Sequence, residues 1–305
     1  MASSSKLTLT FLGCGNMGTA ILSGILDAST ATTSPFARII ACTKTQQSAD
    51  KLSTRFKDHA SPLNLDFLAS QNTAAAEQAD VIILGCKPYL VDAMLAEEGL
   101  ADALAGKLVI SIIAGKTIDV LSEAISKNQK KSNSVPFRKA VIIRAIPNVA
   151  ASVRESMTVI ELPASTSAAP APSPSPSDDQ KGLITWIFSQ IGQTKFLGSE
   201  LFDCGTMLMA SIATISVAVD GVLDGCVAEG MKRAEASEMT AQCLLGLARL
   251  LKAGHHPAVL RESISSPGGC TIQGLLAVER GGVRSAFAES VLDGTGHLKR
   301  LQERE

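Results

Sequence analysis

Aromatic residues are scarce in this chain, because Phe, Tyr and Trp together make up only 4% of its 305 residues. Hydrophobic residues still account for 46% of the sequence. The expected cores are therefore built from closely packed Ala, Val, Ile and Leu rather than from rings. At 31.7 kDa the chain exceeds the usual size of one domain, so we expect two smaller domains or one large one.

An excess of charge of either sign is also missing. The 28 Lys and Arg residues nearly balance the 29 Asp and Glu residues, which leaves a formal net charge of -1. The sequence contains no extended run of Lys and Arg. Nucleic-acid binding requires a concentrated basic face, so we expect no nucleic-acid partner.

The seven cysteines lack any pairing pattern. They are scattered along the chain, with no CxxC pair and no His at the spacing of a metal ligand. An odd and dispersed set is typical of reduced thiols in the cytosol and not of a disulfide framework or a zinc site. We expect no metal site.

Targeting and membrane signals are absent as well. The first ten residues contain neither an apolar signal core nor an Arg-rich presequence. The uncharged, apolar stretch at residues 204–219 includes Ser and Thr and is short for a bilayer span. We therefore expect a buried helix there, no membrane partner and a cytoplasmic protein.

The first half of the sequence alternates apolar, β-prone runs with helical patterns. The runs are nearly continuously apolar, as strands buried on both faces must be. This alternation predicts an α/β fold with a doubly wound parallel sheet. The expected strands cover residues 7–12, 38–42, 80–84, 108–113 and 140–143, and helices are expected between them at 17–26 and 47–56.

The composition changes after this region. Residues 164–179 are rich in Ser, Pro and Ala, and we expect a disordered or extended insertion with little that could enter a core. An interdomain hinge is the alternative. A helix at 182–190 and a strand at 194–197 would then complete a first domain of residues 1–198.

Residues 199–305 show no strand pattern and predict an all-helical second domain. Helical periodicity covers residues 208–227, 237–252, 257–263, 271–280 and 283–292. The stripes in 208–227 and 243–251 carry more apolar surface than a domain of this size can bury alone. We expect a homodimer or a higher homo-oligomer.

A glycine motif follows the first predicted strand. Residues 13–18 read GCGNMG and match GxGxxG between a strand and a helix, which is the context of a Rossmann-type dinucleotide site. Gly13 permits the tight turn, Gly15 lets the backbone approach a pyrophosphate, and Gly18 allows the helix to pack closely. The N–H groups of Asn16 and Met17 would face the phosphates.

The end of the second predicted strand carries no carboxylate. Sites that prefer NAD place an Asp or Glu there for the ribose 2′-hydroxyl, whereas this chain has Thr43 and Lys44. A hydroxyl and a cation suit the 2′-phosphate, so we expect NADPH, with NADH as the alternative. Lys87 and Pro88 follow another strand and would reach the same crevice.

Two further segments carry polar groups that suit a small ligand. Asn148 follows the predicted strand at 140–143 and offers a donor and an acceptor together. Residues 265–272 read SSPGGCTI just before a helix, and free N–H groups at a helix start can hold a carboxylate. A simple turn, with Thr271 near the helix cap, is the alternative for this loop.

The segment SSPGGCTIQGLLAVERGGVRSAFAESV resembles the signature of pyrroline-5-carboxylate reductases. GCGNMG, GCKP and RAIPNVAA are similar to the other motifs of that family and occur in the same order. The resemblance covers nearly the whole chain. It implies NAD(P)H-dependent reduction of the cyclic imine 1-pyrroline-5-carboxylate to L-proline, by an interlocked dimer with a helical dimerisation domain.

The resemblance also implies roles for individual residues. The threonine beside the imine nitrogen falls on Thr271, which we expect to be the catalytic residue, and the nicotinamide-side asparagine and strand-end lysine fall on Asn148 and Lys87. The carboxylate-binding loop falls on Ser266, Gly268, Gly269 and Cys270, which together with Thr271 are the expected substrate-binding residues.

Two departures from the family pattern leave alternatives open. Residues 209–214 lack the glycines and proline that open the family's first dimerisation helix, and PNVAA at 147–151 replaces PNTPA. A related reductase of a substituted pyrroline carboxylate and a non-catalytic dinucleotide-binding paralogue are therefore the alternatives. A β-hydroxyacid dehydrogenase-like enzyme is disfavoured, because its catalytic lysine has no counterpart between Ser199 and Gly230.

Overall fold

A computed structural model describes residues 6–28, 34–59, 61–129, 138–163 and 173–302. Its contacts divide the chain into two compact units, the first made of residues 1–209 with 297–305 and the second of residues 210–296. The boundary that the sequence predicts at residue 198 falls where the last strand ends.

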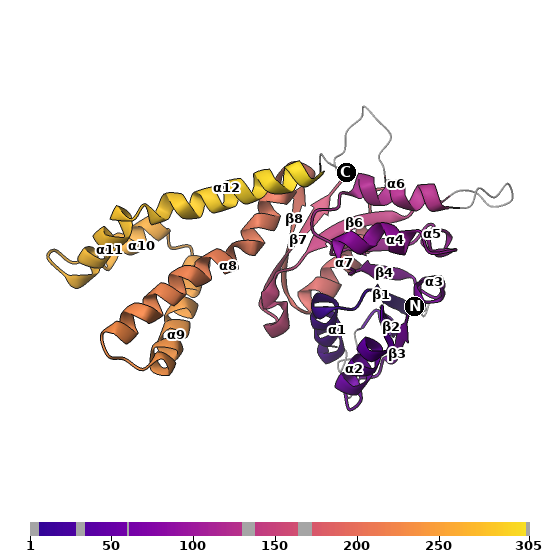
Figure 1. Cartoon of the computed structure of the whole chain (residues 1–305), viewed down its shortest axis with the longest axis horizontal. Coiled ribbons are helices and arrows are strands. Elements are labelled where there is room, and N and C mark those ends of the chain that lie inside the picture. Colours follow the sequence, from indigo (N-terminus) through magenta and orange to yellow (C-terminus); the bar gives the residue numbers. More distant parts are fainter. Residues whose placement is uncertain (1–5, 29–33, 60, 130–137, 164–172, 303–305) are drawn as a thin grey trace. The chain divides into compact units, whose positions relative to one another are not determined.

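The first unit is built on one eight-stranded sheet (Figure 1). Its spatial order is β3-β2-β1-β4-β5-β6-β7-β8. The strands β1 to β6 are parallel to one another, whereas β7 runs antiparallel to β6 and parallel to β8. The strands are β1 (Leu7–Leu12), β2 (Phe36–Thr43), β3 (Asn64–Ala69), β4 (Val81–Leu84), β5 (Leu108–Ser111), β6 (Val141–Ile146), β7 (Ser156–Leu162) and β8 (Gly192–Gly198).

Helices cover both faces of this sheet, and successive strand residues point to opposite faces. Phe11 packs in a cluster with α1, α2 and α7, whereas its neighbour Leu12 packs in a cluster with α3, α4, α5 and α6. The helices are α1 (Asn16–Ala28), α2 (Gln46–Phe56), α3 (Asn72–Glu77), α4 (Val91–Leu95), α5 (Leu100–Ala103), α6 (Ile118–Asn128) and α7 (Asp178–Ser189), with short 3₁₀ turns at η1 (Pro88–Leu90) and η2 (Val149–Val153). The doubly wound α/β fold predicted from the sequence is therefore confirmed.

Two strands were missed by the sequence analysis. β3 is an edge strand whose residues are exposed or half-buried, so it lacks a continuous apolar run. β7 contains the charged Glu161, which is buried because it pairs with Arg144 on β6. The missed β7 also reverses the strand direction at that side of the sheet.

The sequence predicted a disordered or extended insertion at residues 164–179. Residues 164–172 lie outside the described part of the chain, and for residues 173–179 the prediction was wrong. Ser173 is buried, and its hydroxyl accepts from the Ile142 N–H and donates to the Ala140 carbonyl, at 2.7 and 3.1 Å. Helix α7 already begins at Asp178, because Ser177 and Gln180 form a reciprocal capping box. This end of the segment is therefore attached to the sheet.

Every described element after β8 is a helix, as the sequence predicts. The helices are α8 (Ser199–Ala228), α9 (Arg233–Lys252), α10 (Pro257–Ser263), α11 (Cys270–Arg280) and α12 (Val283–Gln302). The α8–α9 hairpin turns at Gly230, whose φ of +94° favours glycine. Arg233 on α9 forms ion pairs with Asp220 and Asp224 on α8 and so joins the two helices.

The prediction of a buried helix at residues 204–219 was wrong for the single chain. Only Phe202, Asp203, Gly205 and Thr206 of α8 are buried, and apolar residues beyond them, such as Val217, are exposed. By length and composition α8 is long and apolar enough to cross a membrane, and it is the one such helix among the described residues. Its apolar surface lacks cover within one chain.

Candidate functional site

The turn between β1 and α1 requires glycine at its first position. Gly13 has a φ of +89°, and a Cβ atom placed there would lie 2.6 Å from the Cys86 backbone nitrogen. Its own N–H donates to the Cys42 carbonyl at the end of β2, at 3.0 Å. The turn thus lies where β1, β2 and β4 end, which is the place where doubly wound sheets bind ligands.

The second and third glycines of the motif differ in their surroundings. A Cβ atom at Gly15 would have no described atom within 4 Å, so the backbone there is open to a bound group. A Cβ atom at Gly18 would lie 3.3 Å from the Cys14 Sγ and 3.5 Å from the Gly13 carbonyl, inside the packed helix contact. Asn16 and Met17 open α1, where the N–H groups and helix dipole favour an anion. This turn fits the pyrophosphate of a dinucleotide.

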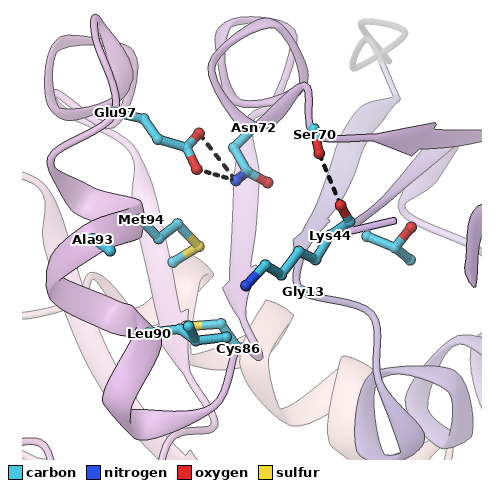
Figure 2. A pocket seen from close by; sticks show the side chains of 10 residues that line it. Gly13, Lys44, Ser70, Asn72, Cys86, Leu90, Ala93, Met94 and Glu97 are labelled. Atoms are coloured by element: carbon cyan, nitrogen blue, oxygen red, sulfur yellow. Dashed lines mark hydrogen bonds between the residues drawn. The ribbon is translucent and has the colours of Figure 1, made fainter. Parts of the chain in front are cut away.

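Some polar side chains at the end of β2 bond to the protein's own backbone, and one is exposed. The buried Thr43 hydroxyl lies within hydrogen-bonding distance of the Thr45 and Leu68 carbonyls, at 3.0 and 3.3 Å, so it faces its own backbone. The Thr45 side chain caps α2 by accepting from the Ser48 N–H. Lys44 is exposed, and its ammonium group extends into the neighbouring cavity (Figure 2).

A cavity of about 160 Å³ lies beside the glycine turn. Figure 2 shows an apolar wall from η1 and α4 on one side and polar side chains from the loops after β2 and β3 on the other. The lining consists of Gly13, Thr43, Lys44, Ser70, Asn72, Cys86, Leu90, Ala93, Met94 and Glu97. Sequence reasoning missed Ser70 and Asn72 because it missed β3, after which they lie.

The other predicted residues of the nucleotide side follow the ends of β4 and β6. Lys87 and Pro88 are exposed and begin η1 directly after β4. The Asn148 Oδ1 accepts from the Ala150 N–H at 3.2 Å, and its backbone N–H donates to Ser156 Oγ at 3.1 Å. These contacts fix the Asn148 side chain as the cap of η2.

Two cysteines near the turn are held as neutral thiols. Burial raises the pKa of Cys14 to about 12, against a weaker opposing hydrogen bond from Thr19. Burial also raises the pKa of Cys86, which lines the cavity, to about 11. Neither thiol is a nucleophile at neutral pH.

The predicted substrate loop belongs to the second unit. Gly268 has a φ of +72°, and the Gly269 N–H donates to the Ser266 carbonyl at 3.0 Å. Gly269 is the N-cap of α11, so Thr271 stands inside the first turn of the helix and is exposed. Since glycine offers no capping side chain, the first N–H groups of α11 are suited to an external acceptor. Within the described part of the chain no cluster of His, Cys, Asp and Glu suits a metal ion.

Comparisons with known proteins match both halves of this chain. The family model for pyrroline-5-carboxylate reductase dimerisation matches residues 199–301, which contain the exposed apolar helices. The model described as NADP oxidoreductase, coenzyme F420-dependent, matches residues 8–115, which contain the glycine turn and the cavity. A nicotinamide dinucleotide site and a homo-oligomerisation region are thereby supported.

Relatives that align over nearly their whole length show which family this chain belongs to. A pyrroline-5-carboxylate reductase from Neurospora crassa is 41% identical over 320 residues, which cover 96% of this chain and 92% of the relative. Another, from Lophium arboricola, is 39% identical over 309 residues, with coverages of 95% and 92%. The fold is also that of the Plasmodium falciparum pyrroline carboxylate reductase solved with NADP bound, at a TM-score of 0.74 and 21% identity, with coverages of 97% and 98%. This chain therefore belongs to the pyrroline-5-carboxylate reductase family.

Proposed function

We propose that this chain reduces 1-pyrroline-5-carboxylate to L-proline with NADPH, as a step of proline biosynthesis. The observation that carries the proposal is the likeness to relatives of that name over almost their whole length. The substrate motif at residues 265–272 and the glycine turn at 13–18 are both present within that likeness. In this chain they would supply the cofactor site and the substrate site that NAD(P)H-dependent imine reduction needs.

Residues of the first unit fit the cofactor. Gly13, Gly15 and the start of α1 would hold the pyrophosphate, and Lys44 would pair with the 2′-phosphate of NADPH. Lys87, Pro88 and Asn148 would contact the nicotinamide half. The bound cofactor supplies a hydride from C4 of its dihydronicotinamide. The preference for NADPH over NADH rests on Lys44 and on the absence of a carboxylate from residues 43–45.

Residues of the second unit would hold the substrate. The N–H groups at the start of α11, with Ser266, Gly268, Gly269 and Cys270, suit the carboxylate of the imine. The Thr271 hydroxyl would hydrogen-bond the ring nitrogen and keep the protonated imine oriented. A protonated imine is already electrophilic, so the protein acts by positioning rather than by an acid–base pair.

Removing the Thr271 hydroxyl tests its role. We expect Thr271→Ala to lower turnover by about ten- to a thousandfold, on the scale of losing one well-placed polar group. Ser263→Ala, which removes another exposed hydroxyl of the same unit, is the matched control and should retain turnover. Unchanged turnover in Thr271→Ala would remove Thr271 from the mechanism.

The remaining assignments complete the proposal. Residues 1–198 would form the nucleotide-binding domain, and residues 199–305 the dimerisation and substrate domain of a homodimer or larger ring. We place the protein in the cytoplasm, without a membrane partner, on the grounds given by its sequence.

The identity of the imine is the point at which this proposal can fail. Oxidation of NADPH should be followed at 340 nm with 1-pyrroline-5-carboxylate and with ring-substituted analogues, each at several concentrations. The proposal expects the highest kcat/KM for the unsubstituted substrate. A higher value for a substituted ring would favour a specialised reductase, which residues 209–214 motivate. If the protein binds NADPH tightly but no imine causes NADPH oxidation, the result would favour a non-catalytic dinucleotide-binding protein.

A further inference from the structure

The cavity beside the glycine turn lies on the adenosine side of the nucleotide site, if the function proposed above is correct. A dinucleotide with its pyrophosphate at the start of α1 places the adenosine ribose near the end of β2. The adenine ring is the next group beyond that ribose. It therefore falls among the ends of β2 and β3 and helix α4, where the cavity lies.

The size and apolar wall of the cavity suit a flat ring. Its volume of about 160 Å³ is below the roughly 300–1,000 Å³ of sites that hold a whole ligand. Leu90 and Met94 form one wall, on the side opposite Lys44 (Figure 2). A planar base can lie with its face against this wall and its edge toward the polar residues.

The polar edge of the cavity is a fixed pair of side chains. The Asn72 amide nitrogen donates to both oxygens of Glu97, at 2.8 and 3.1 Å. This two-point contact between the start of α3 and the loop after α4 holds the carboxylate in one orientation (Figure 2). Each carboxylate oxygen has two lone pairs, so Glu97 can accept a further hydrogen bond from within the cavity.

We propose that Glu97 recognises the exocyclic amino group of the cofactor's adenine and makes the site selective for adenine over hypoxanthine. An ionised carboxylate only accepts hydrogen bonds. Adenine presents an amino donor at its six position, whereas hypoxanthine presents a carbonyl oxygen there. Two acceptors would then face each other, and the hypoxanthine cofactor loses affinity.

The electrostatic effect of Glu97 on the phosphates must be separated from this contact. Replacing Glu97 removes a negative charge near the 2′-phosphate and strengthens the binding of any phosphorylated cofactor. That effect is equal for the adenine and hypoxanthine cofactors. The ratio of their dissociation constants therefore isolates the contact at the base edge.

Isothermal titration calorimetry on the full chain measures this ratio without relying on turnover. The titrants are NADPH and reduced nicotinamide hypoxanthine dinucleotide phosphate. We expect the wild type to bind NADPH about tenfold more tightly, on the scale of one hydrogen bond to a charged group. Glu97→Gln should bring the ratio to within about twofold, because its amide also donates. Glu98→Gln removes the same charge outside the cavity lining and should keep the wild-type ratio.

Each outcome of this titration decides the proposal. Equal affinities in the wild type, or an unchanged ratio in Glu97→Gln, overturn the role of Glu97 and leave the proposed reductase function intact. If Glu98→Gln also loses the selectivity for the adenine cofactor, the selectivity comes from general negative charge. That result also overturns the role of Glu97. A wild type that binds neither cofactor overturns both this inference and the proposed function.

Discussion

Two glycines of the turn between β1 and α1 have different roles, one in folding and one in cofactor binding. Gly13 is required by the fold, because its φ is positive and a Cβ atom there would lie 2.6 Å from the Cys86 backbone nitrogen. Gly15 has open space around it, so no folding contact requires glycine there. Alanine at Gly13 should therefore impair folding, whereas alanine at Gly15 should impair cofactor binding.

We expect Gly15→Ala to weaken NADPH binding about ten- to a hundredfold, because a methyl group against the pyrophosphate costs about 1–3 kcal/mol. Its unfolding free energy should change by less than about 1 kcal/mol. Gly182→Ala in α7, which also has open space, should affect neither property adversely. Denaturation and calorimetry on both variants measure this. A destabilised Gly15→Ala that binds NADPH normally would contradict the role of Gly15.

The buried thiol of Cys14 makes stability depend on alkaline pH. Its folded pKa of about 12 exceeds the ordinary 9.0, so above pH 9 the unfolded chain loses this proton while the folded chain keeps it. Stability is therefore full below pH 9 and is lost toward pH 12, by at most about 1.4 kcal/mol per pH unit. Urea midpoints at pH 8, 9, 10 and 11 should fall more steeply for the wild type than for Cys14→Ala. Parallel curves would refute this account.

At the scale of elements, a buried charge cluster joins β6, β7 and α8. Arg144 lies 3.1 Å from Glu161 and 3.8 Å from Asp203, and its guanidinium lies over the Phe202 ring at 4.4 Å. The amide of Gln302, at the end of α12, donates to Asp203 at 3.0 Å. The start of α8 and the end of α12 thus meet at Asp203, which in turn pairs with Arg144.

Arg144→Met leaves two buried carboxylates without their cation. We expect it to lower the unfolding free energy of the protein by about 3–5 kcal/mol, measured by urea denaturation. Arg38→Met breaks a more exposed pair with Asp66 and should cost less than about 1 kcal/mol. Equal losses in the two variants would show that burial of the cluster has no special effect.

The sequence predicts the elements whose signal is local. The apolar run before Gly13 predicts β1, and apolar runs likewise predict β4 and β5. β7 was missed because the burial of Glu161 depends on Arg144, which lies 17 residues earlier. Glu97 was missed for the same reason, because only the folded chain brings it to Asn72, 25 residues away in sequence. Contacts between distant residues are not readable from one local pattern.

At the scale of the whole molecule, the exposed face of α8 accounts for the failed prediction of burial. Ile212, Ile215 and Val222 are spaced for one helix face and are exposed in the single chain. The match of residues 199–301 to a dimerisation family explains this apolar surface. We therefore expect this face to be buried in a homo-oligomer and not in the single chain.

We expect Ile215→Glu to weaken self-association at least about a hundredfold, because a charge at the centre of an apolar interface costs at least about 2–3 kcal/mol. Analytical ultracentrifugation over a dilution series measures the association. Val153→Glu places the same charge on an exposed residue outside residues 199–301 and should leave association unchanged. An unaltered association constant for Ile215→Glu would exclude this face from the interface.

Isotope labelling can show whether the hydride of NADPH is transferred to the imine carbon. The protein is incubated with 1-pyrroline-5-carboxylate and NADPH carrying deuterium at the transferred position of C4, and the product is analysed by mass spectrometry. We expect L-proline with one deuterium at C5, formed in step with NADPH oxidation. Oxidation without labelled proline, or no reaction despite bound NADPH, would contradict this expectation.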